Sequence, residues 1–122
     1  MMTWVFIGCL LAFLAVALGA FGAHALRSRR SPEQLAVFQT GVQYQVLHAL
    51  ALILVGVLER GVIPDSVATA AGWLFLVGTV LFSGSLYLLV LTGMRRLGAI
   101  TPFGGLCFLA GWLVLAIATL HP

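Results

Sequence analysis

Residues 34–58 read QLAVFQTGVQYQVLHALALILVGVL, with no charged side chain, and the stretch is longer than the about 20 residues that a helix needs to cross a bilayer core. Three more uncharged stretches cover residues 1–26, 66–94 and 97–122. Of the 122 residues, 62% are hydrophobic and 7% are charged, whereas soluble domains have roughly 45–50% and about 25%. The sequence therefore predicts a membrane protein with four transmembrane helices.

Capping signals mark where the second and third helices begin. Ser31 and Gln34 can form a capping box around Pro32, which suits the first turn of a helix. After the next turn, Asp65 or Ser66 can cap the third helix. Because the connections are short, consecutive helices are expected to be antiparallel neighbours.

A similar signal marks the fourth helix, where Thr101 precedes Pro102. Residues 93–100 are then expected to form an interfacial loop. The predicted fold is a single all-α domain over residues 1–122, an antiparallel up-and-down bundle of four transmembrane helices at residues 3–26, 32–59, 65–92 and 102–121.

The arginines predict the orientation in the membrane. Arg60 lies in the second loop, and the first and third loops carry Arg27, Arg29, Arg30, Arg95 and Arg96. The positive-inside rule places the first and third loops in the cytoplasm and both termini outside. No basic residue precedes the first apolar stretch, so we interpret it as a retained helix rather than a cleaved signal peptide.

Small residues recur on one face of the first and fourth predicted helices. Helices in lipid associate through close packing, which small side chains permit, so both faces are expected to contact other helices. The first face consists of Gly8, Ala12, Ala15, Gly19 and Gly22, and the second of Gly104, Cys107, Gly111, Val114 and Ala118. Cys9 falls near the outer face of the membrane and Cys107 near the inner face, so they are predicted to remain separate thiols.

Several hydrogen-bonding side chains of the second predicted helix fall at bilayer depth, where lipid cannot satisfy them. Because a helix turns by about 100° per residue, Thr40, Tyr44 and His48 form one stripe with Gln45 beside it. Gln43 points the other way, toward another helix or another subunit. Both sides of this helix are therefore expected to meet protein or water.

The third predicted helix carries a matching polar stripe. An antiparallel register places Gln45 at the depth of Thr79, with His48 within about one turn of it. We expect His48, Gln45 and Tyr44 to lie against the third helix near Thr79 and Ser83. The candidate intramembrane polar cluster consists of Thr40, Gln43, Tyr44, Gln45, His48, Thr79, Ser83 and Tyr87.

His48 admits a functional and a structural interpretation. An ionisable side chain within a membrane is a functional hypothesis by default, yet a neutral histidine is also an ordinary hydrogen-bonding partner between helices. His24 lies about 5 Å inside the cytoplasmic boundary and His48 about 20 Å, so the two cannot hold one haem within a protomer.

The sequence lacks the patterns of catalytic and cofactor sites. It contains no acid–base pair, metal-binding cluster, phosphate loop or nucleophile motif, so we expect no catalytic residue, cofactor, metal or enzyme activity. No predicted span contains Asp, Glu, Lys or Arg, which disfavours an ion-coupled transporter. The net charge of +3 comes from arginines beside the membrane, a topology signal, so no nucleic-acid partner is expected.

Short motifs along the whole chain carry a family resemblance. They are GAFGAHAL at residues 19–26, TGVQYQ at 40–45 with HAL at 48–50, LFSGSLY at 81–87, and ITPFGG at 100–105 with AGW at 110–112. As a set they resemble the bacterial inner-membrane family catalogued as domain of unknown function 423, and more distantly the eukaryotic transmembrane protein 256 group. The resemblance implies a four-span protein of the bacterial inner (plasma) membrane and supplies no catalytic or binding residue.

Two classes of function remain. The first is a non-enzymatic membrane component, such as an assembly factor, an accessory subunit or a module that contacts lipid or quinone, and the absence of charged residues in the spans favours it. The second is an oligomeric channel or transporter for a small polar solute, with Gln43, Gln45 and His48 lining a polar route. Membrane lipid is an expected partner, and a homo-oligomer or another membrane protein stays open.

Overall fold

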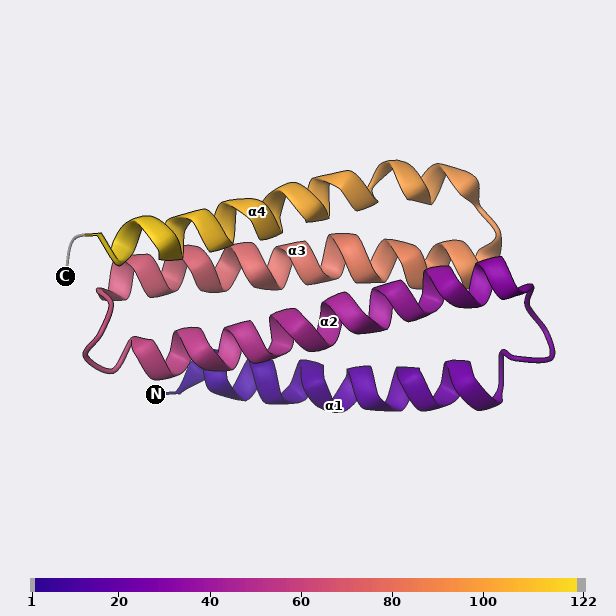
Figure 1. Ribbon diagram of the computed structural model, residues 1–122, viewed down its shortest axis with the longest axis horizontal. Helices are drawn as coiled ribbons and strands as arrows, with labels where there is room; N and C mark the ends of the chain where they lie inside the picture. The colour runs from indigo at the N-terminus through magenta and orange to yellow at the C-terminus, as the bar shows by residue number, and fades with distance from the viewer. Residues whose placement is uncertain (1, 121–122) are drawn as a thin grey trace.

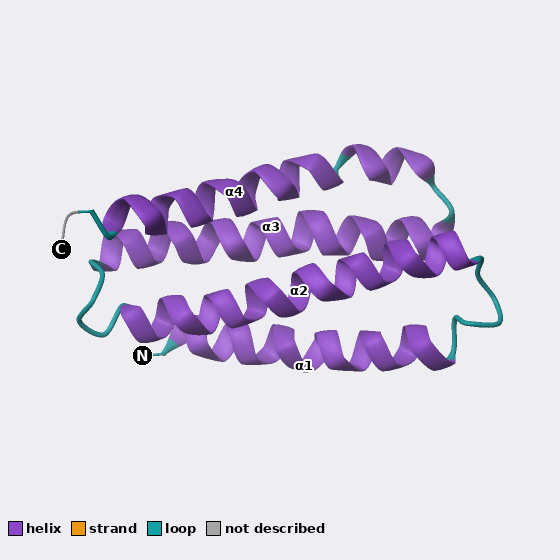
Figure 2. Ribbon diagram, viewed as in Figure 1, coloured by secondary structure: helices purple, strands orange, loops and turns teal. Residues whose placement is uncertain are grey.

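The computed structural model describes residues 2–120, which form four long helices joined by short loops (Figure 1). In chain order the elements are α1 (Thr3–His24), α2 (Pro32–Leu58), α3 (Asp65–Thr92), the short 3-10 helix η1 (Arg95–Ala99) and α4 (Thr101–Ala118). Each long helix runs antiparallel to the one before it, and all four are long and apolar enough to cross a membrane (Figures 1 and 2). The predicted all-α membrane bundle is therefore confirmed.

The start of α2 follows the sequence signal. The backbone N–H of Gln34 donates to Ser31 Oγ at 3.2 Å, and the backbone N–H of Ser31 donates to Gln34 Oε1 at 3.1 Å. This reciprocal pair is the predicted capping box, with Pro32 as the first helical residue.

The other two predicted caps are wrong. The N-cap of α3 is Pro64, whose extended backbone suits that position, and Asp65 is already helical. The N-cap of α4 is Ile100, while the Thr101 hydroxyl lies 2.6 Å from Ser85 Oγ of α3. At this level of the bundle, a neighbouring helix competes for the side chain that would otherwise cap its own helix.

The helix ends differ from prediction by a few residues. α1 ends at His24 rather than 26, α2 at Leu58 rather than 59, and α4 at Ala118, while the predicted end at 121 lies outside the described residues. The predicted interfacial loop at 93–100 contains η1, a turn of helix that follows the left-handed Gly93. A glycine at this position accepts a positive φ at little cost and so ends α3.

The helices form a flattened layer in which each one packs mainly against its neighbours in the chain. Backbone contacts join α1 to α2, α2 to α3 and α3 to α4, in the order seen down the shortest axis (Figure 1). Some side chains reach one helix further, as where the rings of Trp4 in α1 and Trp73 in α3 lie 5.7 Å apart. The central helices α2 and α3 are therefore more buried than α1 and α4.

Glycines set the closest helix contacts. A Cβ added to Gly8 would lie 2.6 Å from the carbonyl oxygen of Ala49, and one added to Gly22 would lie 2.9 Å from the ring of Phe38. Ala15, between them, is fully buried. The small-residue face of α1 is thus confirmed as its contact with α2, as expected where packing rather than water holds helices together.

The fourth helix packs in the same way through part of its small-residue face. Gly104 and Gly111 are buried, and a Cβ on Gly111 would lie 2.6 Å from the ring of Phe75 in α3. Cys107, on the same face, is partly buried, and both it and Cys9 are free thiols. The predicted separation of the two cysteines is confirmed.

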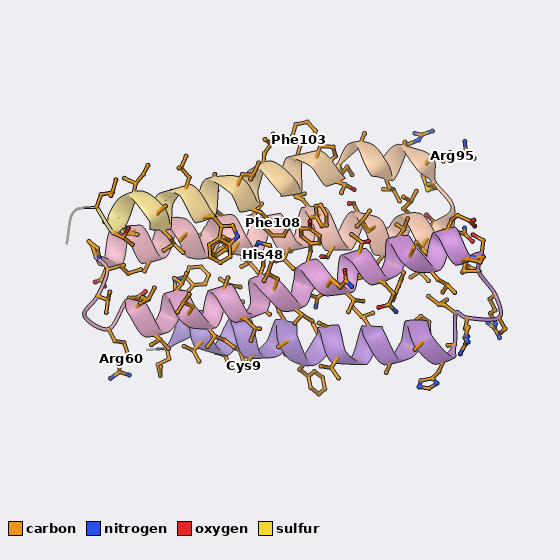
Figure 3. The ribbon with its side chains drawn as sticks, in the orientation of Figure 1. Cys9, His48, Arg60, Arg95, Phe103 and Phe108 are labelled. Carbon is orange, nitrogen blue, oxygen red and sulfur yellow. The ribbon has the colours of Figure 1, made fainter. Side chains whose placement is uncertain are left out.

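One arginine of the first loop stabilises the end of α3. The Arg30 Nε–H donates to the carbonyl oxygen of Val90 at 3.0 Å, and Arg30 Nη2 lies 3.4 Å from that of Leu91. A cation is favourable at a helix C-terminus, where carbonyl groups lack helical partners. Arg95 lies at this end of the layer and Arg60 at the other (Figure 3).

Two adjacent glycines provide a test of the packing. An added methyl on Gly104 would overlap the backbone of Phe82, whereas nothing lies within 4 Å of one on Gly105. We expect Gly104→Ala to lower the free energy of unfolding by about 1–3 kcal/mol, the usual cost of overpacking. Gly105→Ala should leave it unchanged or raise it by up to about 1 kcal/mol, because alanine is the better helix former. Titration with a denaturing detergent measures both, and equal effects would contradict the assigned contact.

Candidate functional site

Gln45 is the polar centre of the first three helices. Its side chain is buried at 4% exposure, and its Nε2–H donates to the carbonyl oxygen of Leu11 in α1 at 2.8 Å. Its Oε1 accepts a hydrogen bond from the Tyr87 hydroxyl of α3 at 2.6 Å. A single amide of α2 therefore ties α1 and α3 to it.

A second bond joins α2 and α3 one turn away. The Ser83 hydroxyl donates to the carbonyl oxygen of Gly41 at 2.7 Å. The backbones approach closely here, since a Cβ on Gly41 would lie 2.8 Å from the ring of Tyr87. Gly41, Gln45, Ser83 and Tyr87 thus form one inter-helix network.

Gln45 and Thr79 both line one groove, consistent with their expected match in depth, but they do not hydrogen-bond to each other. The Thr79 hydroxyl donates to the carbonyl oxygen of Phe75, one turn back in its own helix, at 2.8 Å. Thr40 does the same, donating to the carbonyl oxygen of Ala36 at 3.0 Å. Threonine readily makes this local bond, so its presence at the right depth does not create an inter-helix partner.

His48 lies in a different environment, between α2 and α4. It is 2% exposed, and its ring is stacked on Phe108 of α4 with centroids 3.5 Å apart and an angle of 7° between the planes (Figure 3). The Trp112 indole Nε1–H donates to His48 Nε2 at 3.0 Å. On the other side, His48 Nδ1 lies 2.9 Å from the carbonyl oxygen of Tyr44.

These two contacts determine the proton position on the imidazole. An indole N–H can only donate and a carbonyl oxygen can only accept, so Nε2 carries the lone pair and Nδ1 carries the proton. A proton on Nε2 would oppose the Trp112 donor. The site therefore holds the neutral Nδ1–H tautomer, and both ring nitrogens are already hydrogen-bonded within the protein.

An aromatic cluster surrounds the imidazole. Phe75 of α3 lies 5.4 Å from it between ring centroids, and Tyr44 and Phe82 pack against each other at 4.5 Å. The His48 aromatic cluster, as we call it, consists of Tyr44, His48, Phe75, Phe82, Phe108 and Trp112. Its members come from α2, α3 and α4, so it holds these three helices together. The Gln45 network does the same for α1, α2 and α3.

The sequence pattern missed Trp112 as the partner of His48. Phe108 and Trp112 are four residues apart and so lie on one face of α4. The contact of Gly111 with Phe75 fixes the register of α3 and α4 and places this face at the depth of His48. Depth matching extended to the fourth helix would have found the indole, the strongest donor on that face.

Two apolar grooves open on the surface of the layer. The α1/α3 groove, about 500 Å³, is lined by Leu11, Leu14, Ala17, Leu18, Phe21, Gln45, Thr79, Val80, Gly84 and Tyr87. The α2/α4 groove, about 420 Å³, is lined by Tyr44, Leu47, His48, Phe82, Pro102, Gly105, Leu106, Phe108, Leu109 and Trp112. Gln45 of α2 is part of the lining of the first groove and Phe82 of α3 is part of the lining of the second.

Gln43 does not join either polar group. It is exposed on α2, and among residues 2–120 its side chain makes no hydrogen bond. At about 100° per residue it lies about 200° around the helix from Gln45 and on one stripe with Leu47. It therefore faces outward from α2, next to Leu47, which lines the α2/α4 groove.

The chemistry available to the described residues is that of hydrogen bonding and apolar contact. Every buried side-chain nitrogen or oxygen among them has a hydrogen-bond partner. Residues 2–120 contain no group of three or more potential metal ligands. The candidate cluster of eight residues is thus divided by the structure into the network around Gln45, the environment of His48 and Tyr44, two locally bonded threonines and the exposed Gln43.

Sequence comparison identifies similar proteins. A family described as "Protein of unknown function (DUF423)" matches residues 18–105. The UPF0382 membrane protein of Staphylococcus haemolyticus is 48% identical over 119 residues, 98% of this chain and 96% of its own length. The UPF0382 membrane protein YwdK of Bacillus subtilis is 46% identical over 97% of this chain and 96% of its own. No solved structure matches.

The assigned tautomer can be measured directly. In protein with isotope-labelled histidine, nitrogen NMR should show His48 with a protonated Nδ1 and an unprotonated Nε2, because of the Tyr44 carbonyl and the Trp112 indole. The His48→Ala variant identifies the signal by its loss. Trp112→Phe should shift the Nε2 resonance and lower the free energy of unfolding by about 1 kcal/mol, since a buried acceptor loses its donor. A protonated Nε2 would contradict the assignment.

A double-mutant cycle tests the Gln45 network. Gln45→Leu and Tyr87→Phe should show a coupling of about 0.6 kcal/mol, and at most about 1.7 kcal/mol, the range measured for hydrogen bonds between membrane helices. Gln45→Leu with Thr79→Val is the matched control and should show almost no coupling, because Thr79 bonds to its own helix. A larger coupling to Thr79 than to Tyr87 would overturn the network.

Proposed function

The chain belongs to the DUF423 family of membrane proteins, and on this premise we propose that it is a non-enzymatic multi-pass membrane component that binds membrane lipid along its α1/α3 groove. The observation that carries the proposal is the state of the buried polar groups. All of those described are hydrogen-bonded inside the protein. What the molecule offers to its surroundings in the spans is mainly apolar surface.

The environment of His48 supports a structural rather than a catalytic role. A general base needs a free nitrogen within hydrogen-bond reach of a substrate. In this site the Trp112 N–H occupies Nε2 and the Tyr44 carbonyl accepts from Nδ1. We therefore assign His48 to the packing of α2 against α4.

The alternative of a channel has weaker support within one protomer. Gln45 faces α1 and α3, His48 faces α4, and Gln43 faces outward. Three side chains that diverge in this way do not line a common route. A polar path across subunits would have to be built mainly from Gln43, and the flux measurement below tests for it.

The α1/α3 groove fits an acyl chain. Its polar side chains Gln45, Thr79 and Tyr87 are already hydrogen-bonded, so the groove offers hydrocarbon contact and no free polar group. From Leu11 to Phe21 it extends about 15 Å along the membrane normal, half of the about 30 Å hydrocarbon core. One leaflet's acyl chain has this length.

The groove ends near the arginine-rich end of the layer, which favours an anionic headgroup. Phe21 lies close to the end of α1, and Arg27 and Arg29 follow in the exposed first loop. Basic residues beside a membrane attract anionic lipids by about 1 kcal/mol each. By the positive-inside rule we assign this end to the cytoplasmic leaflet of the plasma membrane, with both chain termini outside.

Lipid mass spectrometry tests the proposal. Protein purified in a mild detergent should retain anionic phospholipid, and Gly84→Leu should remove most of it, because nothing lies within 4 Å of an added Cβ at Gly84 and a leucine would fill the groove. Gly105→Leu, in the other groove, is the matched control and should retain it. Reconstituted protein should give no solute flux in liposomes. Flux that depends on Gln43, or lipid retention unaffected by Gly84→Leu, would refute the proposal.

A further inference from the structure

Two consecutive polar residues of α2, one on its exposed ridge and one in the α2/α4 groove beside that ridge, lack hydrogen-bond partners. Gln43 is exposed and Tyr44 is 41% exposed, and neither side chain hydrogen-bonds with another residue of the described chain. Both lie about 17 Å from the start of α2 at Pro32, near the middle of a core about 30 Å thick. At this depth lipid offers neither a donor nor an acceptor to an amide or a hydroxyl.

An exposed ridge lies beside the α2/α4 groove. Gln43 and Leu47 stand on an exposed ridge of α2, and Leu47 also forms a wall of the α2/α4 groove beside that ridge. The groove has room at Gly105, where nothing lies within 4 Å of an added Cβ. A face with a ridge next to a groove can pair with a copy of itself, because each ridge enters the other groove under a two-fold rotation.

Membrane insertion restricts the direction of that rotation. Two copies inserted in the same orientation can be related only by an axis along the membrane normal, which keeps every residue at its own depth. Gln43 of one copy then meets the α2 surface of the other at the level of residues 43 and 44. The Gln43 amide of one copy and the Tyr44 hydroxyl of the other thereby lie at the same depth in the membrane.

From the depth, exposure and shape of this face we infer that the protein forms a symmetric dimer through α2 and the α2/α4 groove, with Gln43 hydrogen-bonded to Tyr44 of the partner subunit. Each bond occurs twice by symmetry. The dimer leaves the α1/α3 groove open, because Gln45 in that groove lies about 200° around α2 from Gln43. The inference therefore stands apart from the lipid proposal, and either can fail alone.

A second copy is a better occupant of this face than lipid or an unrelated helix. An acyl chain would fill the α2/α4 groove but would leave the Gln43 amide without a partner. A helix of another protein would need its own polar group at the same depth. A second copy supplies one at that depth as a consequence of symmetry.

Disulfide cross-linking in native membranes tests the inference. In a background with Cys9→Ala and Cys107→Ala, Leu47→Cys should cross-link between copies, since Leu47 is one turn from Gln43 on the same ridge. Val80→Cys is the matched control, because Val80 is 61% exposed, lines the α1/α3 groove and lies at nearly the same depth. It should give no cross-link.

Substitutions then separate the two features of the interface. Gln43→Leu should weaken dimerisation about eightfold in a dilution series by energy transfer, the loss expected for two hydrogen bonds of average strength between membrane helices. Gly105→Leu should abolish the dimer by filling the groove, whereas Gly84→Leu should leave it intact. Bound lipid, measured in the same preparations, should be lost with Gly84→Leu and retained with Gly105→Leu.

Three outcomes would overturn the dimer. The first is a protein that stays monomeric at high density in the membrane with no cross-link at Leu47→Cys. The second is a cross-link that persists unchanged with both Gln43→Leu and Gly105→Leu. The third is a lipid or a different protein bound at the α2/α4 groove in place of a second copy.

Discussion

The absence of water in the bilayer core governs this structure. A polar group there must find its partner within the protein, and apolar surface gains little from contact with other apolar surface. Helices can then be held only by close packing and by hydrogen bonds between them. Gly8 and Gly22 supply the close approach of α1 to α2, and Gly104 supplies that of α4 to α3. Gln45 and His48 supply the hydrogen bonds.

These bonds occur at two separate points, and this separation shapes the molecule. The Gln45 network joins α1, α2 and α3, and the His48 aromatic cluster joins α2, α3 and α4. Neither reaches across from α1 to α4, and the helices lie in a layer rather than in a closed square (Figure 1). A layer leaves grooves between alternate helices, one between α1 and α3 and one between α2 and α4. The surfaces that we assign to lipid and to a second copy are consequences of that arrangement.

The polar residues of α2 therefore have three different roles, although they lie within a few residues of one another. Gln45 and His48 are buried, and each of their side-chain nitrogens and oxygens has a hydrogen-bond partner, so they stabilise the fold. The Thr40 hydroxyl hydrogen-bonds to a backbone carbonyl oxygen of its own helix. Gln43 makes no side-chain hydrogen bond within the described chain, like its neighbour Tyr44, and it faces away from the rest of the layer. An exposed amide at mid-membrane depth is a stronger indication of a partner than a buried histidine with both nitrogens occupied.

The sequence by itself determined the four spans, their antiparallel order, the capping box at Ser31 and the small-residue face of α1. Each of these depends on residues that are close in the chain or on a helical period, and the transfer of charge into lipid is too costly to allow another arrangement. The depth of the polar residues also followed from the sequence, because helix rise and turn position set it. Gln43 points away from Gln45 as expected, but it is exposed rather than packed against another helix of the protomer.

Only the tertiary structure decided which groups bond to which. At one depth several donors and acceptors compete, and the outcome depends on the rotation of each helix and on the reach of each side chain. The long side chain of Tyr87 reaches Gln45 and donates a hydrogen bond to it. Thr79, at a similar depth, has a short side chain whose hydroxyl bonds to the backbone of its own helix. Trp112 donates a hydrogen bond to His48 because the contacts of Gly104 and Gly111 with α3 set the packing and register of α4. Differences of this kind amount to about 1 kcal/mol and arise from contacts between helices, so no local pattern in the chain encodes them.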